Sequence, residues 1–168
     1  KAIASSLQQT TIGNPSNEKV RMGALAAESQ RAEVRSQVQK LLASSQIVYG
    51  TLDSVEVIDA DPQKGAFISP ILLKNENPFS SKEVHDVEVF GPVSTIMPYR
   101  DLSEAIELSK KGKGSLCSTI VTADNKIAAD YVVGAGPWHG RMLVLNSDCA
   151  KESTGHGSPL PMLVHGGP

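Results

Sequence analysis

The sequence predicts an α/β protein with a parallel sheet and flanking helices. The chain of 168 residues is 40% hydrophobic, enough to bury the core of one domain. In its second half, β-rich runs at 93–97, 116–122 and 142–145 alternate with helical segments. Strands joined through helices form βαβ units, so the three runs predict two consecutive units with parallel strands and right-handed crossovers.

The first helices are predicted from the spacing of apolar residues. Ile3 and Leu7 stand four apart, as on one face of a short helix that ends before the turn-rich stretch 13–17. Apolar residues recur at helical spacing over 29–42, with charged and polar residues between them. This pattern predicts an amphipathic surface helix.

Short strands are expected next. Segments 46–51 and 54–58 are β-branched and predict two strands joined by a turn. The apolar run 66–73 contains Pro70, which has no N–H to donate and therefore favours a sheet edge or an irregular crossing. Residues 75–81 are typical of a loop.

The helices of the second half carry clear start and stop signals. Asp101, with Glu104 three residues later, predicts a capped start for a helix that runs to Lys110 and stops at Gly112. Asp124 is a second N-cap candidate, for a helix that ends by the Gly-Pro turn before the last strand.

Charge and composition exclude several partners. The chain has 16 Lys+Arg against 18 Asp+Glu, and its longest basic block is Lys110-Lys111, so neither nucleic acid nor an anionic membrane is an expected partner. No apolar run approaches the roughly 18 residues that span a bilayer, and the N-terminus lacks a leader pattern. A cytoplasmic location is expected.

Cysteine and histidine spacing predicts no metal site. Cys117 and Cys149 cannot form a disulfide framework and have no CxxC or Cys/His ligand spacing. Cys117 is expected in a buried strand and Cys149 in a loop, and neither is expected to be catalytic. The histidines lack helical i, i+4 pairs and are expected to be solvated; they are His85, His139, His156 and His165.

The most informative motif is Glu88-Val89-Phe90-Gly91-Pro92-Val93. The Gly-Pro pair fixes a bend directly before a strand, which holds Glu88 and Phe90 in a set geometry at the rim of the sheet. A carboxylate there can accept two hydrogen bonds from a sugar diol while the ring packs on a flat heterocycle. The alternative is an exposed glutamate and a core phenylalanine before an ordinary strand.

Other motifs accompany it in a fixed order. They are Gly13-Asn14-Pro15, Met22-Gly23-Ala24-Leu25, the helix over 29–42, the Gly-x-Phe-x-x-Pro-x-x-Leu pattern from Gly65, Asp101 to Ile106 and Leu143-Val144-Leu145-Asn146. This order resembles the second half of the catalytic domain of NAD(P)-dependent aldehyde dehydrogenases, over nearly the whole chain. The resemblance implies that a cysteine thiolate attacks the aldehyde, hydride passes to the nicotinamide, and water activated by a glutamate releases the acid.

By this resemblance, Glu88 would hold the hydroxyls of the nicotinamide ribose and Phe90 would pack near the nicotinamide of NADP or NAD. In the family, the nucleophilic cysteine, the general base and the cofactor domain precede the region that matches this chain, and neither Cys117 nor Cys149 matches the nucleophile. Residues 1–168 are therefore expected to be the C-terminal portion of the catalytic domain, inactive alone. The alternative is a non-catalytic α/β interaction or oligomerisation domain.

The tail adds a finer resemblance. His165-Gly166-Gly167 stands where most of the superfamily has Phe-Gly-Gly, as in the aldehyde dehydrogenase half of bacterial phenylacetate-degradation ring-opening proteins, which oxidise a CoA-linked semialdehyde with NADP. In the family this region lines the substrate tunnel and the enzymes are oligomers, so a homo-oligomer is expected. The expected tunnel residues are Asp148, Cys149, His156, Ser158 and His165. A loop without substrate contact is the alternative.

Overall fold

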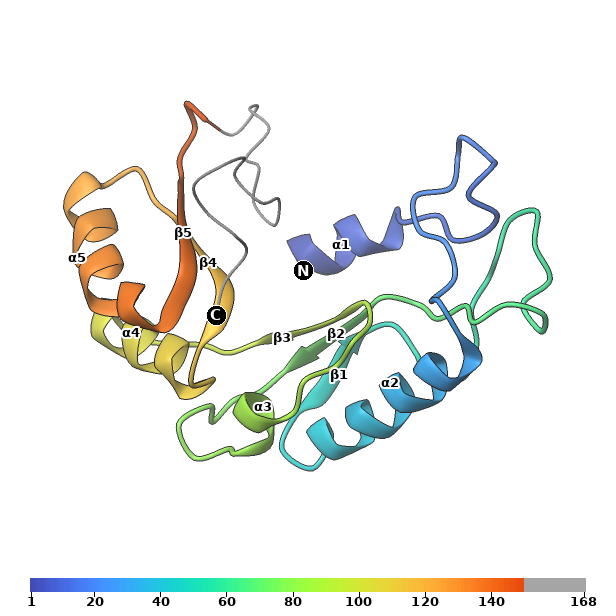
Figure 1. Ribbon diagram of the computed structural model, residues 1–168, viewed down its shortest axis with the longest axis horizontal. Coiled ribbons are helices and arrows are strands. Elements are labelled where there is room, and N and C mark those ends of the chain that lie inside the picture. Colours follow the sequence, from blue (N-terminus) through green and yellow to red (C-terminus); the bar gives the residue numbers. More distant parts are fainter. Residues whose placement is uncertain (150–168) are drawn as a thin grey trace. The chain divides into compact units, whose positions relative to one another are not determined.

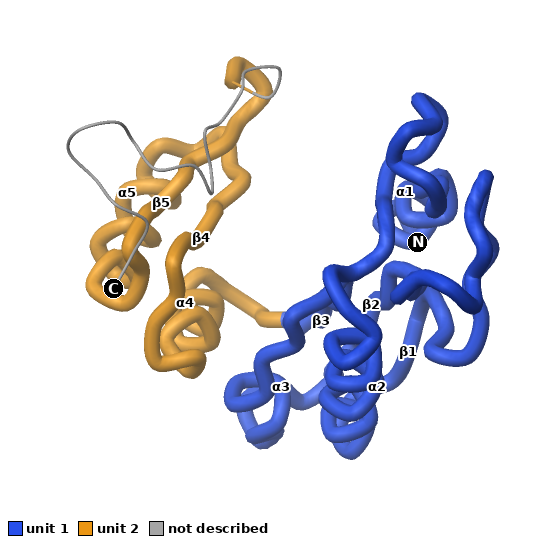
Figure 2. The backbone as a smooth tube through the Cα atoms, turned by 45° about the vertical axis from the view of Figure 1, so that its right-hand side comes forward, with its two compact units in different colours: residues 1–98 blue, residues 99–168 orange. Residues whose placement is uncertain are grey.

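The computed structural model describes residues 1–149. The chain divides into two compact units, Lys1–Pro98 and Tyr99–Pro168, coloured separately in Figure 2. Each unit combines helices with a small sheet that contains a parallel strand pair, which confirms the predicted α/β class. Within the described part of the chain, no helix has both the length and the apolar character needed to cross a membrane.

The sheet of the first unit has the strand order β1-β2-β3 (Figure 1). Strand β1 (Gln46–Tyr49) runs antiparallel to β2 (Ile71–Lys74), and β3 (Val93–Ile96) runs parallel to β2 with Ile71 opposite Val93. Strand β2 is the apolar centre of this sheet, with Ile71, Leu72 and Leu73 all less than 5% exposed.

Helix α2 (Glu28–Leu41) supplies three of the buried core residues of the first unit. Val34, Val38 and Leu41 recur at helical spacing and pack with Ile68, Ile71 and Leu73 in one buried cluster. Figure 1 shows this helix alongside the sheet. The unit also contains α1 (Ala2–Gln8) and the short α3 (Glu83–Asp86). The predicted helices over 29–42 and around Ile3 are thus confirmed, whereas α3 was not predicted.

The second unit is one βαβ motif with a preceding helix. Helix α4 (Leu102–Lys111) precedes β4 (Ser115–Val121), and α5 (Asn125–Ala135) with the 3-10 turn η1 (Gly136–Trp138) connects β4 to β5 (His139–Leu145). The two strands pair in parallel. Both predicted caps are confirmed: Asp101 accepts from the Glu104 N–H, and Asp124 accepts from the N–H groups of Lys126 and Ile127.

Three strand predictions need correction. Segment 54–58 is not a strand, because only Ile58 forms a bridge, to Gly13. The turn expected before it is instead hydrogen-bonded to α2, since Arg35 Nε donates to Leu52 O at 3.0 Å. The run 66–73 is irregular up to Pro70, as one of the two alternatives expected, but its last residues belong to the central strand β2 rather than to an edge strand. Finally, of the two predicted βαβ units, the one formed by β4, α5 and β5 is confirmed, whereas β3 pairs in parallel with β2 rather than with β4.

Three side-chain environments also differ from expectation. Cys117 is only partly buried. Its neighbour Ser118 faces α5, with its hydroxyl 2.7 Å from Tyr131 Oη, and successive residues of a strand point to opposite faces, so Cys117 points away from α5. His139 begins β5 and its Nδ1 lies 2.7 Å from Ser115 Oγ, so it is not a solvated loop residue. His85 lies on α3, with its Nε2 2.7 Å from Pro78 O.

Candidate functional site

The loop that joins α3 to β3 carries the motif that begins at Glu88, and its side chains point alternately towards the core and towards solvent. Val87 and Val89 are partly buried and pack against the core of the first unit. Glu88 is exposed, and the ring of Phe90 is 70% exposed. The alternative of a core phenylalanine is therefore wrong for Phe90. A large ring with this exposure is free to pack against a ligand or another surface.

Main-chain hydrogen bonds fix the Gly-Pro bend. Gly91 N donates to Val89 O at 2.9 Å, and Val93 N donates to Gly91 O at 2.8 Å. Pro92 O in turn accepts from Ile71 N at 2.9 Å, at the first residue of the buried central strand. The bend is therefore continuous with the sheet, and it places Glu88 and Phe90 directly before the start of β3.

Gln30, near the start of α2, belongs to this site and was not predicted. Its Nε2 donates to Phe90 O at 2.8 Å, and its Oε1 accepts from Ala26 N at 3.0 Å. The helix begins after Ala27, whose methyl group cannot accept a capping hydrogen bond, so the local sequence lacks a Ser/Thr-x-x-Gln box. The contact with Phe90 spans sixty positions in sequence, and no local signal could reveal it.

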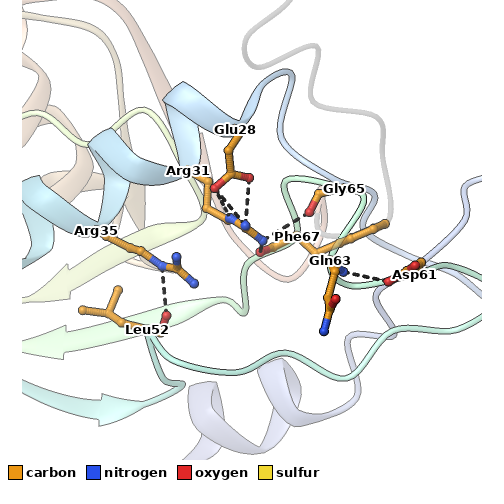
Figure 3. A network of polar contacts seen from close by, with 8 residues as sticks. All are labelled: Glu28, Arg31, Arg35, Leu52, Asp61, Gln63, Gly65 and Phe67. Carbon is orange, nitrogen blue, oxygen red and sulfur yellow. Dashed lines mark hydrogen bonds and ion pairs between the residues drawn. The ribbon is translucent and has the colours of Figure 1, made fainter.

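A second network holds α2 to the segment before β2, as Figure 3 shows. Arg31 donates through one terminal nitrogen to Gly65 O at 3.2 Å and Phe67 O at 3.4 Å, and it pairs with Glu28 at 2.8 Å. Its side chain is 15% exposed. These hydrogen bonds are stronger than bonds between neutral groups because the guanidinium is charged. They therefore stabilise the position of α2, the helix that the loop contacts.

The start of the loop is anchored through α3. Ser44 Oγ donates to Glu83 Oε2 at 3.0 Å. Hydrogen bonds from the Glu83 main chain and from Ser44 lower the pKa of the Glu83 carboxyl below 4.5. Its negative form therefore accepts these bonds at neutral pH. Beside it, Asn75 is fully buried and bonds the turn after α2 to the loop before α3.

Asp148 and Cys149 lie in the second unit, in a turn after β5. Asn146 organises this turn: its Oδ1 accepts from the N–H groups of Asp148 at 2.9 Å and Cys149 at 3.2 Å. The Cys149 thiol is partly buried and accepts from Asn146 N at 3.2 Å. His156, Ser158 and His165 lie outside the described residues. Over residues 1–149, no group of three His, Cys, Asp or Glu side chains is arranged as a metal site.

Two curated proteins are similar to most of this chain. Protein MaoC of Klebsiella aerogenes is 46% identical over 149 residues, which cover 88% of this chain and 42% of that protein. The 3,4-dehydroadipyl-CoA semialdehyde dehydrogenase of Aromatoleum evansii is 36% identical over 167 residues, which cover 99% of this chain and 32% of that protein. The chain thus spans about a third to two fifths of their length.

Solved structures show the same fold. Betaine aldehyde dehydrogenase of Staphylococcus aureus superposes with a TM-score of 0.74 at 22% identity, over 85% of this chain and 27% of that one. Lactaldehyde dehydrogenase of Escherichia coli gives 0.71 at 23% identity, over 85% and 28%. The sequence model of the aldehyde dehydrogenase family matches residues 1–135. With this match over most of its length, the chain belongs to the aldehyde dehydrogenase family.

Proposed function

We propose that this chain supplies the cofactor-positioning loop of a longer enzyme, called the parent enzyme below, which oxidises an aldehyde to a carboxylic acid with NAD or NADP. The observation that supports this most is the 70% exposed ring of Phe90, next to the exposed Glu88, on a bend fixed by main-chain hydrogen bonds. An exposed aromatic ring on a fixed bend presents a flat apolar surface on which a heterocyclic ring can pack.

The residue types fit a nicotinamide nucleotide. The carboxylate of Glu88 can accept hydrogen bonds from both hydroxyls of a ribose, and the Phe90 ring can pack against the flat nicotinamide. When bound, the nicotinamide accepts a hydride from the substrate carbon. Glu88 and Phe90 orient the cofactor and exclude water beside it, and neither of them transfers a proton or forms a bond to substrate.

This chain alone is proposed to be inactive. Cys117 lies in a strand and Cys149 in a turn, and neither matches the nucleophile of the family. Covalent catalysis without its nucleophile loses the chemical step. Incubating the chain with aldehydes and NADP should give no NADPH absorbance. A robust signal that disappears in Cys149→Ala would overturn this assignment.

The proposed substrate is a CoA-linked semialdehyde. The proposal follows the name of the Aromatoleum evansii relative, 3,4-dehydroadipyl-CoA semialdehyde dehydrogenase, and the resemblance of the tail. Asp148, Cys149, His156, Ser158 and His165 are proposed to shape the tunnel for it. A parent enzyme that prefers free aldehydes over CoA-linked ones, by kcat/KM, would contradict this choice of substrate.

Glu88→Gln and Phe90→Ala in the parent enzyme test the cofactor role. Glu88→Gln should raise the KM for NAD(P) about tenfold, because it weakens a charge-assisted hydrogen bond by about 1.4 kcal/mol. Phe90→Ala should raise this KM by up to about tenfold, because the loss of aromatic packing costs about 0.5–1.5 kcal/mol. Glu56→Gln changes an exposed carboxylate outside the loop and is the matched control. An unchanged KM in both loop variants would refute the proposal.

A second candidate function, an interaction or oligomerisation surface, is favoured by the second unit. Val121 and Val133 are 76% and 79% exposed, and Leu116 is 55% exposed. Analytical ultracentrifugation of the chain and of Val133→Asp tests this candidate. A concentration-dependent oligomer that the substitution dissociates would support it, and a monomer at all concentrations would refute it.

A further inference from the structure

We infer that Gln30 is a positioning residue of the cofactor site, which clamps the main chain of Phe90 to the first turn of α2. The inference rests on the proposed function, because it concerns the loop to which that function assigns the cofactor. Its basis is a pair of hydrogen bonds that uses both ends of one side-chain amide, together with a close apolar contact one helical turn further on.

The two bonds define the orientation of the amide. Gln30 Oε1 accepts from Ala26 N, a donor, and Nε2 donates to Phe90 O, an acceptor. Exchanging the oxygen and nitrogen would place donor against donor and acceptor against acceptor, so only one orientation satisfies both partners. The same side chain therefore holds the main chain ahead of α2 and fixes the carbonyl of the cofactor loop.

The apolar contact is made by Val34, which lies four residues after Gln30 on α2. A β-carbon on Gly91 would lie 2.6 Å from Val34 Cγ2, so the main chain of the loop touches α2 directly. Residues four apart lie on one face of a helix. Gln30 and Val34 thus contact consecutive residues of the loop from consecutive turns, and Val38 continues this face into the core at 0% exposure.

The clamp matters because the ring itself has little packing to fix it. With 70% of Phe90 exposed, the direction of the side chain depends on the main-chain torsions on either side of it. The bond from Gln30 restrains the peptide that follows the Phe90 α-carbon. Losing it should weaken cofactor binding through a less ordered loop and leave the chemical step unchanged.

Hydrogen exchange in the 168-residue chain tests the clamp itself. In Gln30→Met, the amides of Gly91 and Val93 should exchange about fivefold faster, the factor that corresponds to about 1 kcal/mol for one hydrogen bond. Gln37→Met is the matched control, since Gln37 lies on the same helix and donates to Glu33. Unchanged exchange in Gln30→Met would overturn the inference.

A third variant separates clamping from capping. Gln30→Glu retains an oxygen for Ala26 N but turns a second oxygen towards Phe90 O, so two acceptors face each other. If the contact with Phe90 carries the effect, Gln30→Glu should speed exchange in the loop at least as much as Gln30→Met. If Gln30→Glu leaves loop exchange as in the unsubstituted chain, the bond to Ala26 is sufficient and the clamp is refuted.

Steady-state kinetics of the parent enzyme test the consequence. Gln30→Met should raise the KM for NAD(P) about fivefold with kcat within about twofold, and Gln37→Met should change neither. An unchanged KM in Gln30→Met together with a raised KM in Glu88→Gln overturns this inference but leaves the proposed function standing. A flat KM in Gln30→Met, Glu88→Gln and Phe90→Ala overturns the proposed function and the inference with it.

Discussion

Gly91 and Val34 approach so closely that a β-carbon on Gly91 would lie 2.6 Å from Val34 Cγ2. Gly91→Ala should therefore destabilise the first unit by about 1–3 kcal/mol, the usual cost of overpacking against a buried side chain such as Val34. Thermal unfolding followed by far-ultraviolet circular dichroism measures it. Gly23→Ala is the control, because a β-carbon there meets no atom within 4 Å.

The double variant Gly91→Ala with Val34→Ala tests the cause. If the clash is responsible, removing the Val34 methyl groups relieves it, and the double variant should lose less stability than the two single losses combined. Strict additivity would show that Gly91→Ala acts through something other than Val34.

Asn75 is polar and fully buried, and its hydrogen bonds should contribute strongly to the free energy of unfolding of the first unit. Its Nδ2 donates to Ser44 O at 2.6 Å, Ser81 Oγ at 2.9 Å and Ser45 Oγ at 3.3 Å, and its Oδ1 accepts from Asn77 N at 2.9 Å. Asn75→Ala leaves several of these groups without a partner, at a cost of about 3 kcal/mol in the free energy of unfolding.

The control for this prediction is Asn77→Ala. Asn77 is exposed and contributes its main-chain N–H and C=O to the same loop, so the substitution should cost no more than about 0.5 kcal/mol. Urea unfolding monitored by circular dichroism compares the two variants. Equal losses would contradict the role of the Asn75 side chain.

The starts of α4 and α5 were predictable from the sequence because their causes are local. Asp101 and Asp124 accept hydrogen bonds from residues two or three positions later, so the residues that make each cap are adjacent in the sequence. Strand pairing is not local. Segment 54–58 has a strand-like composition, but Arg35 bonds Leu52 and only Ile58 forms a bridge, which composition cannot reveal.

The candidate site divides in the same way. The motif indicated Glu88 and Phe90, because a Gly-Pro bend before a strand is a local signal. The exposure of Phe90 depends on which neighbours in the loop face the core, and the contact with Gln30 depends on where α2 packs. Both depend on tertiary contacts, which no local pattern in a single sequence predicts.

The cap of α5 gives a prediction for the second unit. Asp124 Oδ1 accepts from Lys126 N at 2.8 Å and Ile127 N at 3.1 Å, so Asp124→Ala should cost about 1 kcal/mol. Asp124→Asn keeps an acceptor and should cost less than half of that. Fluorescence of Trp138, the only tryptophan of the chain, reports the unfolding of this unit. Equal effects of alanine and asparagine would contradict the cap.

Asp130→Ala serves as the charge control for that cap. Asp130 pairs with Lys126 on the exposed surface of α5, where such pairs contribute about 0.3–0.5 kcal/mol. The substitution removes a carboxylate from the same helix without touching its first N–H groups. A loss as large as that of Asp124→Ala would point to net charge rather than capping.

His139 should make the second unit less stable as the pH falls through 6.5. Burial lowers the pKa of the His139 imidazole below its ordinary value of 6.5, because it disfavours the charged ring. Its Nδ1 lies 2.7 Å from Ser115 Oγ, and among the described residues its buried Nε2 has no hydrogen-bond partner to stabilise a second proton. The unfolded chain therefore binds the proton at a higher pH than the folded one.

The direction of the effect follows from this difference. Stability is fully present above pH 6.5 and decreases as the pH falls from there to the lower pKa of the folded state. Glu83 and Glu104, whose carboxyl pKa values hydrogen bonds lower, act only below about 4.5 and leave the window from pH 5 to 7 clear. Urea midpoints from Trp138 fluorescence should drop across this window in the unsubstituted chain and drop less in His139→Gln. Because the two chains differ only at residue 139, the difference between their two curves isolates the contribution of His139, and parallel curves would contradict the prediction.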